Sequence, residues 1–208
     1  MYDAYEALIF DMDGTLVDSG QLHEHTWTAT LDRFGIPVDA PLMRSLAGVP
    51  TRETLEILLR HFQVSASASV EEMNAFKEKA VRDDGHRYVA ATALSDVVKR
   101  YFGKKPMAVG TGASTAEART TLKLCGLDTF FDVVVGADQV QNPKPAPDTF
   151  LLCARMLGVR AGGCVVFEDS VMGLQAAARA GMAGVDVLVV HDVHNDYFSN
   201  RSDDPRRK

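Results

Sequence analysis

Cysteine is scarce in this sequence, and the three cysteines present lack the spacing of a metal site. Cys125, Cys153 and Cys164 are odd in number, form no C-x-x-C pair and have no histidine nearby at zinc-ligand spacing. The last two lie in apolar runs, where a free thiol behaves as a small hydrophobic side chain. We therefore expect three reduced core cysteines and neither a disulfide nor a zinc site.

Positive charge is also in short supply. The chain has 22 Lys and Arg against 28 Asp and Glu, a net charge of -6. Proteins that hold nucleic acid usually carry a basic face, so nucleic acid is not an expected partner and an anionic ligand must be held locally.

Long apolar runs are missing near the N-terminus. The first run, residues 7–10, is far too short for a signal sequence or a membrane span, and no basic residue precedes it. We expect a cytoplasmic protein with no membrane partner. The sequence leaves its oligomeric state open, and we favour a monomer.

Five short apolar runs predict buried strands. They are continuously apolar and do not alternate with polar residues, which indicates a parallel sheet covered on both faces. The expected strands are Ala7–Phe10, Met107–Gly110, Val133–Gly136, Cys164–Phe167 and Val185–Val190. Helical patterns separate the later runs, as where Ser114 and Glu117 form a capping box. We therefore predict the α/β class, with a doubly wound, Rossmann-like parallel sheet.

An inserted helical unit interrupts this alternation. Between about Gly20 and Tyr88 the sequence has helical patterns and no convincing strand. We expect an α/β core formed by residues 1–17 and 90–190, and a helical cap formed by residues 18–89. The residues after Val190, 191–208, are polar and without pattern, so we expect a disordered tail there.

Chemically active residues follow three of the expected strands. In open α/β sheets the ligand lies beyond the carboxyl ends of the strands, so these positions are expected to converge on one crevice. The segments concerned are Asp11-Met-Asp13-Gly-Thr, Thr111-Gly112-Ala113-Ser, Glu168-Asp169-Ser, and a proline-rich stretch that contains Lys144.

These residue types suit phosphoryl transfer with a divalent cation. Clustered carboxylates repel one another unless a cation lies among them, and oxygen ligands with room for water favour Mg²⁺. Asp11 and Asp13 are two residues apart, so one can attack while the other handles the proton. Lys144, Thr111 and the turn amides after it can hold phosphoryl oxygens.

Each motif alone also has an ordinary structural explanation. An Asp-x-Asp after a strand is more often a solvated turn, and a lysine between prolines is usually an exposed loop residue. Glu168 and Asp169 can simply favour the dipole of the helix that follows. The joint occurrence of all four motifs, in order and at strand ends, makes coincidence improbable.

The pattern resembles the haloacid dehalogenase superfamily, whose four motifs are matched by Asp11-x-Asp13-Gly14-Thr15, Thr111, Lys144 and Glu168-Asp169. The insertion and the segments around Lys144 and Glu168 resemble its β-phosphoglucomutase-like branch. The resemblance implies that Asp11 is the nucleophile and Asp13 the general acid and base. It implies Mg²⁺ held by Asp11, the Asp13 carbonyl and Asp169, with Glu168 reaching only a water on the metal.

The resemblance also bears on substrate. The segments from Met107 and Asp148 are similar to bacterial fructose-1-phosphate and 6-phosphogluconate phosphatases, so hydrolysis of one of these sugar phosphates is expected. The residues expected to face the substrate are His23, Trp27, Thr51, Arg52 and Lys77. For His23 and Lys77 a solvated helix face remains an alternative, and for Trp27 a place in the apolar core. Two other functions stay open: a phosphoglucomutase, and a sugar-phosphate binding protein without turnover.

Overall fold

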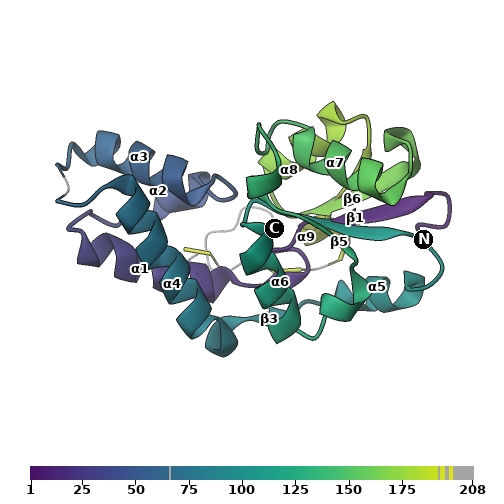
Figure 1. The fold of residues 1–208 in the computed structure, drawn as a ribbon, viewed down its shortest axis with the longest axis horizontal. Helices are drawn as coiled ribbons and strands as arrows, with labels where there is room; N and C mark the ends of the chain where they lie inside the picture. Colours follow the sequence, from purple (N-terminus) through teal and green to yellow (C-terminus); the bar gives the residue numbers. More distant parts are fainter. Residues whose placement is uncertain (66, 192, 195–196, 199–208) are drawn as a thin grey trace.

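Two lobes lie side by side in the computed structural model of this chain (Figure 1). The structure describes residues 1–65, 67–191, 193–194 and 197–198. One lobe contains a five-stranded sheet with helices on both faces, and the other, the helical lobe, contains α1–α4. The chain enters the helical lobe after β1 and β2 and returns from it at β3.

The central sheet is parallel throughout, with strand order β5-β4-β1-β6-β7. Its strands are β1 (Ala7–Phe10), β4 (Met107–Gly110), β5 (Val133–Val135), β6 (Cys164–Glu168) and β7 (Ala183–Asp186). The helices of this lobe are α5 (Ser95–Tyr101), α6 (Thr115–Leu124), α7 (Asp148–Leu157), α8 (Val171–Arg179) and α9 (Val187–Val190). The predicted α/β class and Rossmann-like sheet are confirmed.

Successive residues of the inner strands pack on opposite faces of the sheet, as extended backbone requires. In β1, Leu8 and Phe10 belong to the apolar cluster that includes residues of α5 and α6. Ala7 and Ile9 belong to the second cluster, with residues of α7 and α8. Figure 1 shows these two helix pairs on the two faces. Because both faces are covered, every residue of β1 is buried, which explains its unbroken apolar run.

The last expected strand is wrong over most of its length. Residues 185–190 were predicted as one strand, but β7 ends at Asp186 and Val187–Val190 form the short helix α9. The Asp186 side chain accepts a hydrogen bond from the backbone N–H of Leu188 at 3.0 Å, which satisfies the first turn of a helix. An apolar run of six residues does not by itself distinguish strand from helix.

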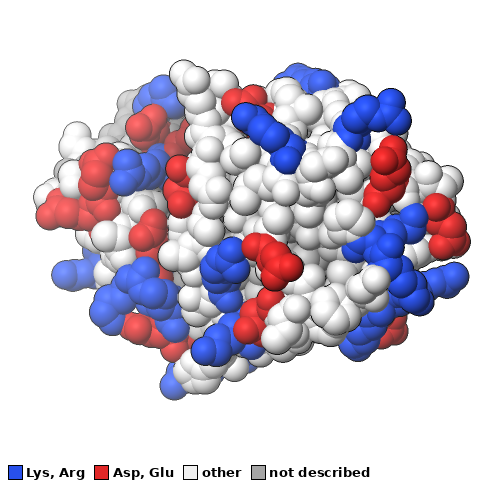
Figure 2. Space-filling view, turned by 45° about the vertical axis from the view of Figure 1, so that its right-hand side comes forward, with Lys and Arg blue, Asp and Glu red and all other residues white. Residues whose placement is uncertain are grey.

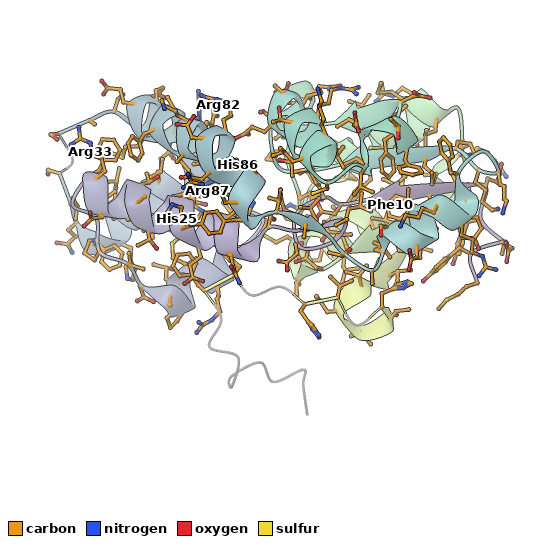
Figure 3. The ribbon with its side chains drawn as sticks, turned by 90° about the horizontal axis from the view of Figure 1, so that it is seen from below. Phe10, His25, Arg33, Arg82, His86 and Arg87 are labelled. Carbon is orange, nitrogen blue, oxygen red and sulfur yellow. The ribbon has the colours of Figure 1, made fainter. Side chains whose placement is uncertain are left out.

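The helical lobe consists of α1 (Gly20–Arg33), α2 (Ala40–Ser45), α3 (Thr51–Phe62) and α4 (Val70–Tyr88). Its apolar cluster includes Trp27, Leu31, Met43 and Leu55. Figure 3 shows α1 with His25 beside α4 with His86 and Arg87, whereas Phe10 lies in the sheet lobe. The ring of His25 stacks on Tyr88 at 5.1 Å between centroids, which joins the two helices near the sheet lobe.

A two-stranded ribbon lies where the chain passes between the lobes, and the sequence did not predict it. β2 (Val17–Asp18) pairs antiparallel with β3 (Ala90–Ala91), so that Val17 lies opposite Ala91. Strands of two residues are too short to show any period of two.

The surface view in Figure 2 shows groups of Lys and Arg side chains close to Asp and Glu side chains, with uncharged residues over much of the middle of that face. An anionic ligand on that face therefore meets charges of both signs. Within the part of the chain that the structure describes, no helix combines the length and the apolar character needed to span a bilayer.

The expected disordered tail, 191–208, is described only at residues 191, 193–194 and 197–198. Val193 is buried in the cluster of the sheet lobe, and Phe198 is buried in the cluster of the helical lobe. Isolated apolar side chains in a polar segment give no periodic signal, so the sequence did not indicate these two buried positions; the expectation of a disordered tail stays a prediction. The remainder of the predicted tail lies outside the described residues.

Candidate active site

The candidate site lies where β1, β4 and β6 end. Asp11 follows β1, Thr111 follows β4, and Glu168 is the last residue of β6. Hydrogen bonds that continue the sheet fix the first two residues. The N–H of Asp11 donates to the carbonyl of Phe167, and that of Thr111 to the carbonyl of Val135, both at 2.9 Å. The three side chains therefore converge on one pocket at the carboxyl edge of the sheet.

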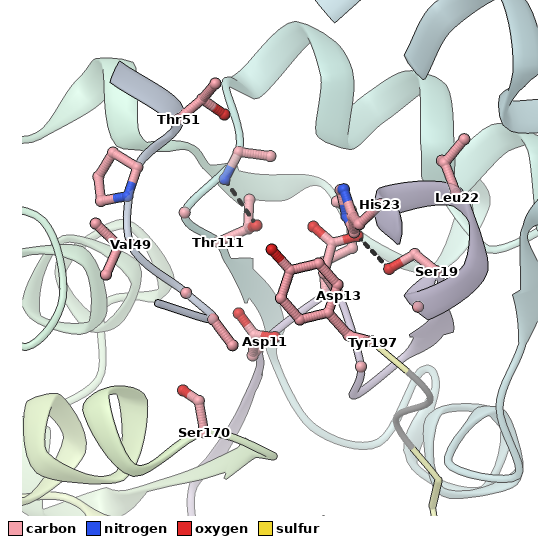
Figure 4. Close-up of a pocket in the computed structure, with 18 of the residues that line it drawn as sticks. Asp11, Asp13, Ser19, Leu22, His23, Val49, Thr51, Thr111, Ser170 and Tyr197 are labelled. Carbon is pink, nitrogen blue, oxygen red and sulfur yellow. Dashed lines mark hydrogen bonds and ion pairs between the residues drawn. The ribbon is translucent and has the colours of Figure 1, made fainter. Parts of the chain in front are cut away.

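A tight turn after β1 places Asp13 in the same pocket. Gly14 has φ of 77°, a conformation that favours glycine, and its N–H donates to the carbonyl of Val17 at 2.8 Å. The N–H of Val17 in turn donates to the carbonyl of Met12 at 2.9 Å. Figure 4 shows Asp11 and Asp13 together in the pocket.

Lys144 forms a buried ion pair with two carboxylates at the base of the pocket. Its Nζ lies 2.6 Å from Oδ1 of Asp11 and 2.6 Å from Oε1 of Glu168. Only 6% of Lys144 is exposed, and its Nζ lies 4.7 Å from the centroid of the Phe150 ring. Burial lowers the pKa of Lys144, but Asp11 and Glu168 outweigh this effect and raise the pKa above its ordinary value. The lysine is therefore charged.

The carboxylates around Asp11 form a suitable set of ligands for a hard cation. Oxygen atoms of Asp11, Glu168 and Asp169 all lie within 4.8 Å of one another. Burial raises the pKa of Asp11, Lys144 opposes the rise, and the charges of Glu168 and Asp169 add to it. A cation among these oxygens would favour the ionised form of Asp11. The donor set, which is all oxygen, fits Mg²⁺.

Glu168 is held by the protein on both of its oxygens. Oε1 accepts from Lys144, while Oε2 accepts from the N–H of Ser170 at 2.9 Å and from its hydroxyl at 2.8 Å. Gly173 leaves the space for this carboxylate, since a Cβ there would lie 1.7 Å from Oε1. Sequence reasoning treated Ser170 only as a helix start and did not single out Gly173. The available signal was a glycine in the first turn of the helix that follows an acidic pair.

Asp13 is hydrogen-bonded by two residues of the segment that begins the helical lobe. The hydroxyl of Ser19 donates to Oδ1 of Asp13 at 2.7 Å, and Nε2 of His23 lies 3.0 Å from the same oxygen (Figure 4). Burial raises the pKa of Asp13, but His23, Ser19 and Lys77 together outweigh burial, so the pKa lies below its ordinary value. Asp13 is therefore ionised in this arrangement. Nothing in the sequence indicated the contact with Ser19, and His23 was expected to face the substrate.

The turn after β4 contains the three residues expected to bind phosphate there. Thr111, Gly112 and Ala113 all line the pocket. The N–H of Ala113 donates to Oγ1 of Thr111 at 3.1 Å (Figure 4), so two of the expected phosphate-binding groups bond each other in this structure.

Residues of the helical lobe form the opposite side of a pocket of about 160 Å³. Four of the five residues expected to face a substrate line it: His23, Trp27, Thr51 and Lys77. The structure does not bring Arg52 among the described residues that line the pocket. Its side chain is exposed and lies 3.9 Å from Glu71. The residue lies in the first turn of α3 with its side chain in solvent.

Lys77 places a second buried cation in the pocket. Only 6% of the residue is exposed, and its Nζ lies 4.9 Å from the centroid of the Trp27 ring. Burial lowers the pKa of Lys77, while Glu117 and Asp13 oppose this effect. An anionic or hydroxyl-rich ligand would stabilise the charge that burial disfavours.

The loop before α3 approaches the sheet lobe closely. A Cβ on Gly112 would lie 3.5 Å from the carbonyl oxygen of Gly48, and a Cβ on Gly48 would lie 3.8 Å from the hydroxyl of Ser170. The helical lobe therefore lies over the carboxylates, and the pocket is a space between the two lobes.

The parallel sheet, the carboxylates at its edge and the buried lysine define a hydrolase of the haloacid dehalogenase-like class. The profile of this family, haloacid dehalogenase-like hydrolase, matches residues 5–181. The chain belongs to that family.

Individual relatives make the class more specific. The chain is 44% identical over 190 residues to the fructose-1-phosphate phosphatase YqaB of Escherichia coli, covering 91% of this chain and 100% of YqaB. It is 34% identical over 197 residues to the phosphorylated carbohydrates phosphatase of Thermotoga maritima, covering 91% and 88%. CbbY from Rhodobacter sphaeroides, in complex with phosphate, is similar with a TM-score of 0.76 at 26% identity, covering 86% and 84%. The predicted superfamily and enzyme class, a phosphoric monoester hydrolase, are confirmed.

Proposed function

We propose that this enzyme is a Mg²⁺-dependent phosphatase of small sugar phosphates that acts through a phosphoryl group carried by Asp11. The observation that carries the proposal is the buried carboxylate of Asp11, held by Lys144 beside Glu168 and Asp169 at the base of the pocket between the two lobes. A buried nucleophile beside a fixed cation is the arrangement that covalent phosphoryl transfer requires.

In the first half of the reaction, a carboxylate oxygen of Asp11 attacks phosphorus and the bond from phosphorus to the sugar oxygen breaks. The proton of the Asp13 carboxyl group passes to that leaving oxygen. In the second half, Asp13 takes a proton from water, which attacks the phosphoryl group on Asp11 and releases inorganic phosphate. Lys144 and Thr111 hold the phosphoryl oxygens during both halves.

Asp13 must carry a proton when the sugar leaves, although its pKa is lowered in this arrangement. An incoming phosphate dianion is a like charge in the same pocket and raises the pKa of a nearby carboxyl group. We infer that substrate binding supplies the shift that lets Asp13 act as an acid. Once the sugar has left, His23 and Ser19 favour the ionised form that accepts a proton from water.

Asp11, the carbonyl of Asp13 and Asp169 would hold Mg²⁺, which when bound would offset charge on the phosphoryl oxygens. The hydroxyl of Thr15 donates to Oδ1 of Asp169 at 3.3 Å, which orients that carboxylate. Both oxygens of Glu168 are already engaged by Lys144 and Ser170. These bonds support its role as a residue that positions Lys144 and reaches the metal only through water.

We propose that residues 18–89, which contain α1–α4, act as a cap, and that residues 1–17 and 90–190 form the catalytic core. The cap would contribute His23, Trp27, Thr51 and Lys77 to substrate binding. A cavity of about 160 Å³ is smaller than the range of about 300–1,000 Å³ typical of ligand pockets, which suits a small metabolite. A cap over the site also excludes water.

The relatives support a phosphorylated carbohydrate as substrate, since both are named as phosphatases of such compounds. We propose fructose 1-phosphate as the preferred substrate. We propose 6-phosphogluconate as the next substrate in preference, on the resemblance of the sequence alone. A cytoplasmic location and a monomeric state stay predictions.

A panel of phosphorylated sugars, assayed for inorganic phosphate with and without Mg²⁺, tests the proposal. We expect release from fructose 1-phosphate that depends on Mg²⁺ and is lost on addition of EDTA. β-Glucose 1-phosphate with a trace of the 1,6-bisphosphate, followed by NMR, tests the mutase alternative. Conversion to glucose 6-phosphate with little free phosphate would contradict the proposal, and tight binding of sugar phosphates without turnover would indicate a binding protein.

A further inference from the structure

Tyr197 and Phe198 lie far along the chain from every motif of the site, and beyond residues 5–181, which match the family. Phe198 is 6% exposed and packs in the apolar cluster of the helical lobe, whereas Val193, five residues earlier, packs in the cluster of the sheet lobe. The C-terminal part of the chain thus has buried contacts in both lobes.

Side chains of the helical lobe hold both backbone polar groups of Phe198. Its N–H donates to Oε2 of Glu24 at 3.1 Å, and its carbonyl accepts from the guanidinium of Arg44. With the ring buried and the backbone bonded on both sides, Phe198 has a defined position over α1 and α2. It therefore fixes the position of its neighbour Tyr197.

Tyr197 lines the pocket that contains Asp11 and Asp13. Its ring packs edge-on against His23 at 6.5 Å and against Phe198 at 4.9 Å between centroids. Figure 4 shows Tyr197 among the residues that line this pocket, with its hydroxyl directed into the pocket. The ring thus narrows the space that a substrate would occupy beyond its phosphoryl group.

We propose that Tyr197 determines substrate specificity, and that Phe198 is the positioning residue that anchors it. A tyrosine ring offers an apolar face for the C–H surface of a sugar and a bulk that excludes larger substrates. This inference rests on the proposed sugar-phosphate phosphatase activity. It assigns one wall of the substrate site to residues outside the family match.

The test compares Tyr197→Ala and Tyr197→Phe with the wild-type enzyme on three substrates. These are fructose 1-phosphate, trehalose 6-phosphate as a larger phosphosugar, and acetyl phosphate, which has no sugar. Tyr88→Ala is the matched control, because Tyr88 is also a half-buried tyrosine of the helical lobe but is not among the residues that line the pocket. Circular dichroism and thermal unfolding check that each variant is folded.

For Tyr197→Ala we expect KM for fructose 1-phosphate to rise about tenfold, because one aromatic contact with the sugar is lost. We expect kcat/KM for trehalose 6-phosphate to rise, and acetyl phosphate turnover to change less than about twofold. Tyr197→Phe keeps the ring, so it should lose less than Tyr197→Ala on fructose 1-phosphate and should keep the wild-type exclusion of trehalose 6-phosphate. Tyr88→Ala keeps the pocket and should behave as wild type.

If the wild-type enzyme hydrolyses fructose 1-phosphate, three results would overturn the inference. The first is an unchanged KM and unchanged size selectivity in Tyr197→Ala. The second is an equal loss in Tyr197→Phe, which would make the hydroxyl the contact. The third is a gain in kcat/KM for fructose 1-phosphate, which would show that the ring blocks the site. A wild type that is active on acetyl phosphate but on no phosphosugar would instead overturn the proposed function.

Discussion

Gly173→Ala should damage this protein although alanine is the better helix former. Gly173 lies in the first turn of α8, and exchanging glycine for alanine inside a helix normally stabilises it by about 1 kcal/mol. Here the new Cβ would lie 1.7 Å from Oε1 of Glu168, whereas ordinary contact begins at 3.4 Å. The carboxylate must therefore move from 1.7 Å to 3.4 Å or more from the new methyl group.

That movement breaks bonds to a buried charge. Glu168 is 1% exposed and accepts from Lys144 and twice from Ser170. Losing two of these bonds, at about 1.5–3 kcal/mol each, outweighs the helix gain and leaves a net loss of about 2–5 kcal/mol in the free energy of unfolding. In urea this lowers the midpoint by about 1–2 M. Because Lys144 loses a partner, phosphatase activity should fall at least about tenfold.

Urea unfolding followed by circular dichroism measures the effect, with phosphate release assayed in parallel. Gly162→Ala is the control, since a Cβ at that exposed glycine meets nothing within 4 Å. Its midpoint should match that of the wild type. If Gly173→Ala unfolds at or above the wild-type midpoint and retains full activity, the reasoning about Glu168 is refuted.

Asp169→Asn and Lys144→Ala should each lower the rate of phosphate release by roughly 10²–10³. Raised Mg²⁺ should partly restore only the activity of Asp169→Asn, because only Asp169 is proposed as a metal ligand. Matching Mg²⁺ titrations of the two variants would contradict the assignment of Asp169 as the ligand. Asp13→Asn should retain more activity on p-nitrophenyl phosphate than on fructose 1-phosphate, because a good leaving group needs little protonation; equal losses on both substrates would argue against the acid role. Burial raises the pKa of the Cys125 thiol to about 11. Iodoacetamide should therefore label Cys125 slowly in the native protein at pH 8 and rapidly after denaturation. Rapid labelling of Cys125 in the native protein would contradict its burial.

The sequence predicted the inner strands well because each is buried on both faces. β1 and β4 begin and end at the expected residues, and all their residues are buried, which explains their unbroken apolar runs. The edge strand β7 is only partly buried, so its apolar run did not show where the strand ends and α9 begins. The ribbon β2–β3 depends on residues more than seventy positions apart, which no local pattern reveals.

The same contrast holds for the candidate site. Strand ends could be located from the sequence, and the structure brings Asp11, Lys144, Glu168 and Asp169 together there. Residues that act through long-range contacts could not be found in this way. Tyr197 reaches the pocket because its neighbour Phe198 is buried in the apolar cluster of the helical lobe, and the polar sequence around these residues does not indicate that contact.

The central claim is that Asp11 carries the phosphoryl group, and trapping that group tests it most directly. The Asp13→Asn variant, mixed with Mg²⁺ and p-nitrophenyl phosphate and quenched in acid, should accumulate phosphoenzyme because it lacks the base that activates water. Tandem mass spectrometry should find the phosphoryl group on Asp11, and borohydride should convert that residue to homoserine. The double variant with Asp11→Asn should remain unlabelled. A phosphoryl group on another residue, or steady turnover of the ester with no trapped phosphoenzyme, would contradict the account.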